Sequence, residues 1–155
     1  MGLTKLYKRI VLYKQWYKKL RAEGYRKMAE LLLEELTIRT TEGLRSFRVE
    51  VARTNKEQST GLTGREKLAP DRGMLFDLGT ERQINMWMRN TSFSLDILFL
   101  GKSGKITSIV SSTTPYSVES IPSKGEVAAV LELVAGARLG IMVGDKVYHS
   151  IFKST

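Results

Sequence analysis

The first part of the chain has the spacing of apolar residues that an amphipathic helix requires. Apolar side chains recur at steps of three and four residues from Leu3 to Leu20, with lysine and arginine between them. Gly24 interrupts the pattern, which then resumes up to Leu36 with glutamates at the polar positions. Because this spacing places the apolar side chains on one face, we predict a helical hairpin or a kinked helix over residues 3–36.

From Leu36 onward the pattern changes to the alternation of apolar and polar residues that is typical of half-buried strands. Thr54 and Glu57 have the spacing of a capping box, which predicts a short helix over residues 55–61. A further turn of helix is expected at 136–139. The predicted strands cover residues 36–40, 47–51, 73–78, 83–88, 95–100, 104–110, 126–133 and 146–152.

Many short strands with little helix between them predict a mainly β domain over residues 37–155. The expected architecture is a β-sandwich or a closed barrel with one or two short helices. The basic amphipathic helical segment, residues 1–36, forms a separate arm in front of this domain.

Positive charge is concentrated in the arm. The whole chain has a formal net charge of +9, and residues 1–27 contain nine lysines and arginines against one glutamate, Glu23. This composition suits contact with nucleic-acid phosphates or with an anionic membrane surface. Alternatively, the apolar stripe docks on the β domain or on a second copy of the chain, which would form a homo-oligomer. The candidate polyanion-binding residues are Lys5, Lys8, Arg9, Lys14, Lys18, Lys19, Arg21, Arg26 and Lys27.

Composition excludes several kinds of chemistry. The chain has no cysteine and a single histidine, His149, so it has no disulfide, thiolate nucleophile, cysteine-ligated metal or multi-histidine metal site. We expect no cofactor. The longest apolar run of the arm is too short for a secretory signal, and no run approaches the roughly 20 apolar residues of a membrane span. We therefore expect a cytoplasmic protein, or a periplasmic one if a native leader is missing.

Several blocks of sequence occur in an order that resembles a known family, domain of unknown function 192. They are Gly61-Leu62, Gly73-Met74-Leu75-Phe76, Trp87-Met88-Arg89-Asn90-Thr91, Leu95–Phe99, Val130–Leu133 and Leu139-Gly140-Ile141. The resemblance covers about residues 45–147. It implies a compact, mostly β, sandwich-like domain and no assigned activity. Arg89 stands where the family usually has lysine, so a role that requires lysine is not indicated.

The same blocks contain the candidate ligand-binding residues. Trp87 lies on the opposite face of its predicted strand from Met86 and Met88. One interpretation packs Trp87 under a loop, and the other makes it one wall of a ligand pocket with a few polar groups around it. Asp96 either joins that pocket or caps a neighbouring loop, with Arg89 as a possible partner. The candidate pocket residues are Trp87, Arg89, Asn90, Asp96 and Arg72.

Metal and acid–base chemistry have weaker support in the sequence. Met86, Met88 and His149 have the soft donor atoms that Cu(I) prefers, although methionine at strand spacing is far more often core filling. The carboxylates Asp71, Asp77, Asp96, Glu132 and Asp145 are spread over different strands, and no local motif marks a catalytic pair. We therefore predict a non-enzymatic domain that binds an unknown small molecule or a protein partner.

Overall fold

The computed structural model describes residues 14–15, 18–19, 21–24 and 32–152. It divides into two units, Met1–Leu33 and Glu34–Thr155. In the first unit residues 14–15, 18–19 and 21–24 are helical, and Lys14, Lys18 and Lys19 are exposed. None of the described helices is long and apolar enough to cross a membrane. The remaining candidate polyanion-binding residues of the arm, apart from Arg21, lie outside the described residues; they are Lys5, Lys8, Arg9, Arg26 and Lys27.

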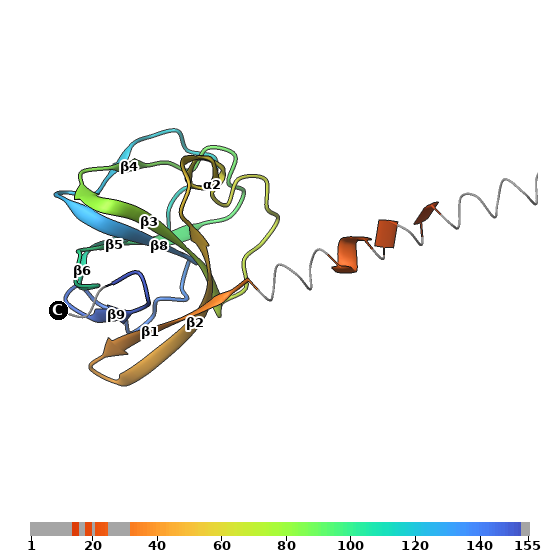
Figure 1. The fold of residues 1–155 in the computed structure, drawn as a ribbon. Coiled ribbons are helices and arrows are strands. Elements are labelled where there is room, and N and C mark those ends of the chain that lie inside the picture. Colours follow the sequence, from red (N-terminus) through yellow and green to blue (C-terminus); the bar gives the residue numbers. More distant parts are fainter. Residues whose placement is uncertain (1–13, 16–17, 20, 25–31, 153–155) are drawn as a thin grey trace, which may run out of the picture. The chain divides into compact units, whose positions relative to one another are not determined.

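The second unit is mainly β, as predicted (Figure 1). The strand that was expected to begin at Leu36 begins at Glu34, and Leu32 and Leu33 are not helical. The helix predicted to reach residue 36 is therefore wrong for its last five residues. The predicted turn of helix at 136–139 is an irregular turn. The elements are β1 (Glu34–Thr40), β2 (Gly43–Ala52), α2 (Asn55–Thr60), β3 (Arg72–Arg82), β4 (Asn85–Met86), β5 (Leu95–Leu100), β6 (Ile106–Val110), β7 (Ile121–Pro122), β8 (Val127–Val134) and β9 (Lys146–Tyr148).

Seven strands form one curled, mixed sheet in the order β6-β5-β8-β3-β2-β1-β9, and β4 pairs with β7 in a small second sheet. Only β2 and β3 run parallel within the large sheet. Its two edges meet where the amide of Ile106 donates to the Asp145 carbonyl at 2.9 Å and the amide of Val147 donates to the Gly104 carbonyl at 2.8 Å. This contact is an isolated bridge between Lys105 and Lys146, and β6 and β9 form no ladder with each other, so the sheet is a curled half-barrel. The sequence predicted a sandwich of two sheets or a closed barrel.

The curl of the sheet creates two apolar cores. The first core fills the inside of the curl and includes Leu36, Ile38, Phe47, Val49, Leu75, Leu98, Leu131, Leu133 and Val147. The second core lies on the other face of β3, β5 and β8 and includes Ala52, Leu62, Met74, Phe76, Met88, Leu95, Ile97, Phe99 and Val130. Because both faces of the central strands are covered, all six residues of β5 are buried, including Asp96. This accounts for the nearly continuous apolar runs in these strands.

The short helix α2 covers part of the second core. Its capping box is present as predicted: the Thr54 hydroxyl accepts from the Glu57 amide at 3.1 Å, and the Glu57 carboxylate accepts from the Thr54 amide at 2.9 Å. Gly61 ends the helix with a φ of 48°. Gln58 then fastens the helix to the sheet, because its side-chain amide donates to the carbonyls of Ala52 and Asp77 at 3.1 and 2.6 Å. These two hydrogen bonds fix α2, which forms one wall of a cleft.

Candidate ligand-binding cleft

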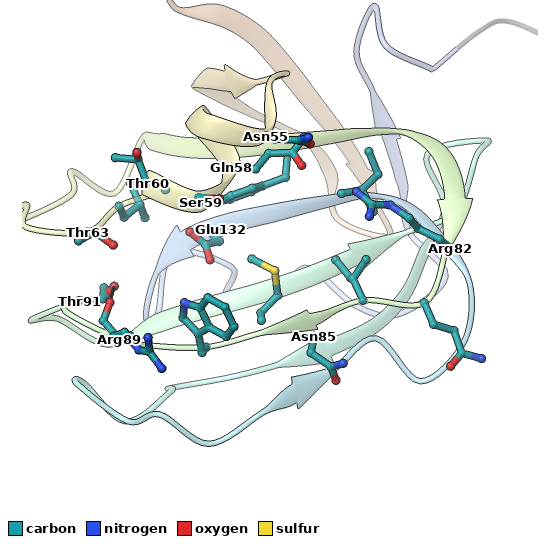
Figure 2. A pocket seen from close by; sticks show the side chains of 18 residues that line it. Asn55, Gln58, Ser59, Thr60, Thr63, Arg82, Asn85, Arg89, Thr91 and Glu132 are labelled. Carbon is teal, nitrogen blue, oxygen red and sulfur yellow. Dashed lines mark hydrogen bonds between the residues drawn. The ribbon is translucent and has the colours of Figure 1, made fainter.

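An open cleft with a volume of about 490 Å³ lies between α2 and the segment that contains β4 (Figure 2). Its lining combines hydroxyl and amide side chains with an apolar surface. The lining residues are Asn55, Gln58, Ser59, Thr60, Gly61, Leu62, Thr63, Phe76, Leu78, Arg82, Gln83, Ile84, Asn85, Met86, Trp87, Arg89, Thr91 and Glu132.

Glu132 is a buried carboxyl group at this cleft. It stands in the middle of β8, directly between Met74 of β3 and Ile97 of β5, and its side chain lies on the face of the second core. The residue is 4% exposed. Figure 2 shows its carboxyl group between Ser59 on the α2 side of the cleft and Arg89 on the other side. Within the described part of the chain, no residue makes a hydrogen bond or an ion pair with this group, and its oxygens open onto the cleft.

The surroundings of Glu132 change its protonation. Burial in the apolar second core raises the pKa of Glu132 from its ordinary value of 4.5 to about 8, because a charged carboxylate loses its hydration there. The group is therefore mostly a neutral acid at pH 7. A neutral carboxylic acid can donate one hydrogen bond as well as accept, which an ionised carboxylate cannot do.

Trp87 and Arg89 line the cleft, whereas Met88 between them points into the second core. Trp87 is 54% exposed and Met88 is 0% exposed. The guanidinium carbon of Arg89 lies 5.3 Å from the centroid of the Trp87 ring, which is within the range of a cation–π contact. Trp87 is thus not sealed in the core. Met86 lines the same cleft, so the predicted alternation, with both methionines on the face opposite to Trp87, holds only for Met88.

The other three candidate pocket residues are not among the lining residues. Asn90 forms the adjacent turn with a φ of 55°, and its carbonyl accepts from the Gly64 amide at 3.0 Å. Arg72 lies at the start of β3. Asp96 is 1% exposed and points to the face of β5 opposite to Ile97.

Asp96 instead connects two loops. Its carboxylate accepts from the backbone amides of Ser112 and Gly136, both at 2.9 Å. The Arg138 guanidinium lies 4.0 Å away, so the basic neighbour is Arg138 and not Arg89. A buried carboxylate that accepts from two backbone amides has a structural role, and this corresponds to the loop-capping role considered from the sequence.

The three candidate Cu(I) ligands do not converge. The Met88 sulfur lies in the second core and accepts from the Thr113 hydroxyl at 3.1 Å. Met86 lines the cleft. His149 follows β9 at the other core, where its Nε2 lies 3.1 Å from a carboxylate oxygen of Glu34 without hydrogen-bond geometry. Among the described residues there is also no group of three or more His, Asp or Glu side chains suited to a metal ion.

An ion pair holds the loop that borders the cleft. The Arg65 guanidinium donates to both carboxylate oxygens of Glu50, at 2.5 and 2.7 Å. This bidentate contact raises the pKa of Arg65 and fixes the loop after α2 against β2. The Ser92 hydroxyl donates to the Arg65 carbonyl at 3.1 Å, which joins the same loop to the turn after Arg89.

Sequence reasoning missed Glu132 as a site residue. A signal was present, because Glu132 alternates with Val130 and Val134 and is therefore placed on an otherwise apolar strand face. The residues of α2 that line the cleft carried no comparable signal, since polar side chains are mostly exposed; they are Asn55, Gln58, Ser59 and Thr60.

Comparison with known proteins agrees with this fold. The family model DUF192 (Uncharacterized ACR, COG1430) matches residues 36–149. A crystal structure of a "putative transcription regulator" from Sinorhizobium meliloti 1021 is 39% identical over 77% of this chain and 95% of that one, with a TM-score of 0.74. A protein of unknown function from Novosphingobium aromaticivorans DSM 12444 is 39% identical over 76% of this chain and 85% of that one, with a TM-score of 0.73. No protein with a curated description matches. The chain belongs to the DUF192 family, as the resemblance of its sequence blocks predicted.

Proposed function

We propose that this domain binds a small molecule in the cleft between α2 and Trp87. The observation that carries the proposal is the Glu132 carboxyl group, which is 4% exposed, lines the cleft and has no partner among the described residues. Buried polar groups are nearly always hydrogen-bonded, and the exceptions call for a specific explanation. A ligand that fills the cleft would supply the missing partner.

The size and lining of the cleft support the same function. Ligand pockets typically have volumes of about 300–1,000 Å³ and combine an apolar surface with a few polar groups, and this cleft has a volume of about 490 Å³. Phe76, Ile84 and Trp87 offer apolar and aromatic surface, while Ser59 and Thr63 offer hydroxyl groups.

Binding fits the lining better than hydrolysis does. Glu132 is the single acidic residue among the described residues that line the cleft. Acid–base hydrolysis of the glycosidase type uses two carboxyl groups on either side of the bond that breaks. Asp96, the other buried carboxylate of the central strands, is already occupied by two backbone amides.

A fragment titration followed by NMR tests this proposal. Trp16→Phe leaves Trp87 as the one tryptophan of the two in the chain, so the remaining indole signal reports on the cleft. Small polar fragments should shift this indole signal and the amides of Ser59 and Thr63. Trp87→Ala should weaken binding at least tenfold, whereas Tyr148→Ala, an aromatic residue outside the cleft, should not. Shifts that survive both Trp87→Ala and Glu132→Leu would contradict the proposal.

We also propose, as a second candidate, that the basic arm binds a polyanion such as nucleic acid. The described lysines Lys14, Lys18 and Lys19 are exposed, and the relative from Sinorhizobium meliloti is called a "putative transcription regulator". Retention on heparin that falls steeply with salt should weaken in the full chain when these three lysines are replaced by glutamine. Replacing the exposed lysines Lys67, Lys102 and Lys124 is the matched control, and an equal loss there would contradict a role for the arm.

A further inference from the structure

The charged side chains of the cleft are of one sign at neutral pH. Arg82 and Arg89 are the two arginines among the lining residues, and the described lining contains no lysine and no aspartate. Glu132 adds no full negative charge, because burial raises its pKa to about 8. The cleft therefore presents positive charge together with a neutral acid.

The positions of these groups suit a ligand with an acidic group. Figure 2 shows Arg82 toward one end of the cleft, and Glu132 and Arg89 toward the other. A guanidinium group offers paired N–H donors that match the two oxygens of a carboxylate. A protonated carboxyl group adds a donor that forms a short, strong hydrogen bond to an anionic oxygen.

We propose that the cleft binds small organic acids, with the anionic group of the ligand held by the Glu132 carboxyl group and Arg89, while Arg82 adds positive charge at the other end of the cleft. This inference rests on the proposed function, because it names the chemical class of the ligand for the same cleft. The ring of Trp87 and the side chains of Ile84 and Met86 cover the apolar part of the ligand.

Such binding is linked to the protonation of Glu132. The strands on both sides place only apolar side chains next to it, Met74 and Ile97, and the charged groups that share its cleft are Arg82 and Arg89. Since the pKa of Glu132 is about 8, its hydrogen-bond donor is lost above that pH. Affinity for an anion should therefore fall by about tenfold for each pH unit above 8.

Three probes with the same ring and different charge separate the ligand classes: benzoate, benzamide and benzylamine. Each is titrated into the full chain at pH 6 to 9.5, and the Trp87 indole signal is followed by NMR. We expect benzoate to bind most tightly and to weaken above pH 8. In Glu132→Gln, benzoate should still bind, because the amide can donate, but its affinity should no longer depend on pH. Arg82→Gln with Arg89→Gln should weaken benzoate and leave benzamide nearly unchanged.

Each of the other possible titration results contradicts one part of the proposal. If benzylamine binds most tightly and improves as pH rises, the ligand is a cation that pairs with ionised Glu132. If benzamide equals benzoate at every pH, the ligand is neutral. If benzoate keeps its pH dependence in Glu132→Gln, Glu132 is not the donor. In all three cases the cleft still binds a small molecule. If none of the probes, nor any of the fragments, shifts the cleft signals, the proposed function itself fails.

Discussion

Glu132→Gln is expected to stabilise the folded protein at neutral pH. In the unfolded chain this carboxyl group titrates near its ordinary value of 4.5, while burial raises the pKa to about 8 in the folded protein. Folding at pH 7 must therefore protonate a group that would otherwise be charged. At about 1.4 kcal/mol per pH unit, the interval from 4.5 to 7 corresponds to a cost of roughly 3 kcal/mol. Glutamine has nearly the same shape and avoids this cost.

The sign of the effect follows from the direction of the shift. Because the folded protein binds the proton more tightly, the contribution of Glu132 to stability is complete below pH 4.5 and is lost as pH rises toward 8. Urea denaturation at pH 5, 6, 7 and 8 measures the free energy of unfolding across this window. The difference between Glu132→Gln and the unmodified chain should grow with pH, to roughly 3 kcal/mol at pH 7 or roughly 10 °C in melting temperature.

The control removes a surface carboxylate from the neighbouring end of the same strand. Glu126 is exposed, so Glu126→Gln should give a curve of stability against pH that runs parallel to that of the unmodified chain. Parallel curves for Glu132→Gln and the unmodified chain from pH 5 to 8 would refute the reasoning, because they would show that Glu132 has the same pKa in both states.

Three further substitutions test the rest of the fold. Thr54→Ala should destabilise the protein by about 1 kcal/mol in thermal denaturation through loss of the capping box, and Thr54→Ser should restore most of it. Asp96→Ala should cost about 2 kcal/mol in urea denaturation, since it leaves the amides of Ser112 and Gly136 without their acceptor; a change below about 0.5 kcal/mol would contradict this. Burial lowers the pKa of His149 below 6.5, so stability should fall as pH drops from 7 to 5. His149→Gln should flatten that fall, and an unchanged slope would exclude His149 as its source.

Elements that depend on local contacts could be predicted from the sequence. The capping box of α2 uses atoms of Thr54 and Glu57 alone, three residues apart, and the helix begins and ends close to where the pattern placed it. The predicted strand at 95–100 is β5. By contrast, the strand predicted over residues 83–88 is only β4, Asn85–Met86, because its partner β7 is itself two residues long. The length of a strand therefore depends on the strand that pairs with it, which lies elsewhere in the chain.

The same distinction applies to the cleft. The opposite directions of Trp87 and Met88 could be predicted because their alternation is local, whereas Met86 lines the cleft beside Trp87 against the predicted pattern. Asn90 and Asp96 are near Trp87 in sequence, yet the turn at Asn90 and the pleat of β5 direct them elsewhere. Glu132 joins the cleft from more than forty positions away through the register of β8 with β3 and β5. No pattern within residues 126–133 reveals which strands flank it.

Two buried carboxyl groups in adjacent strands of one sheet differ in a way that bears on function. Asp96 has two amide donors and a nearby arginine, so its burial is accounted for by the loops that it holds. Glu132 has no such partner among the described residues, and its burial opposes folding at neutral pH by roughly 3 kcal/mol. A leucine or glutamine in its place would avoid that cost and would leave the register of β8 unchanged. No contact among the described residues offsets this free-energy cost of burying Glu132. A compensating interaction would therefore form in the cleft that Glu132 faces.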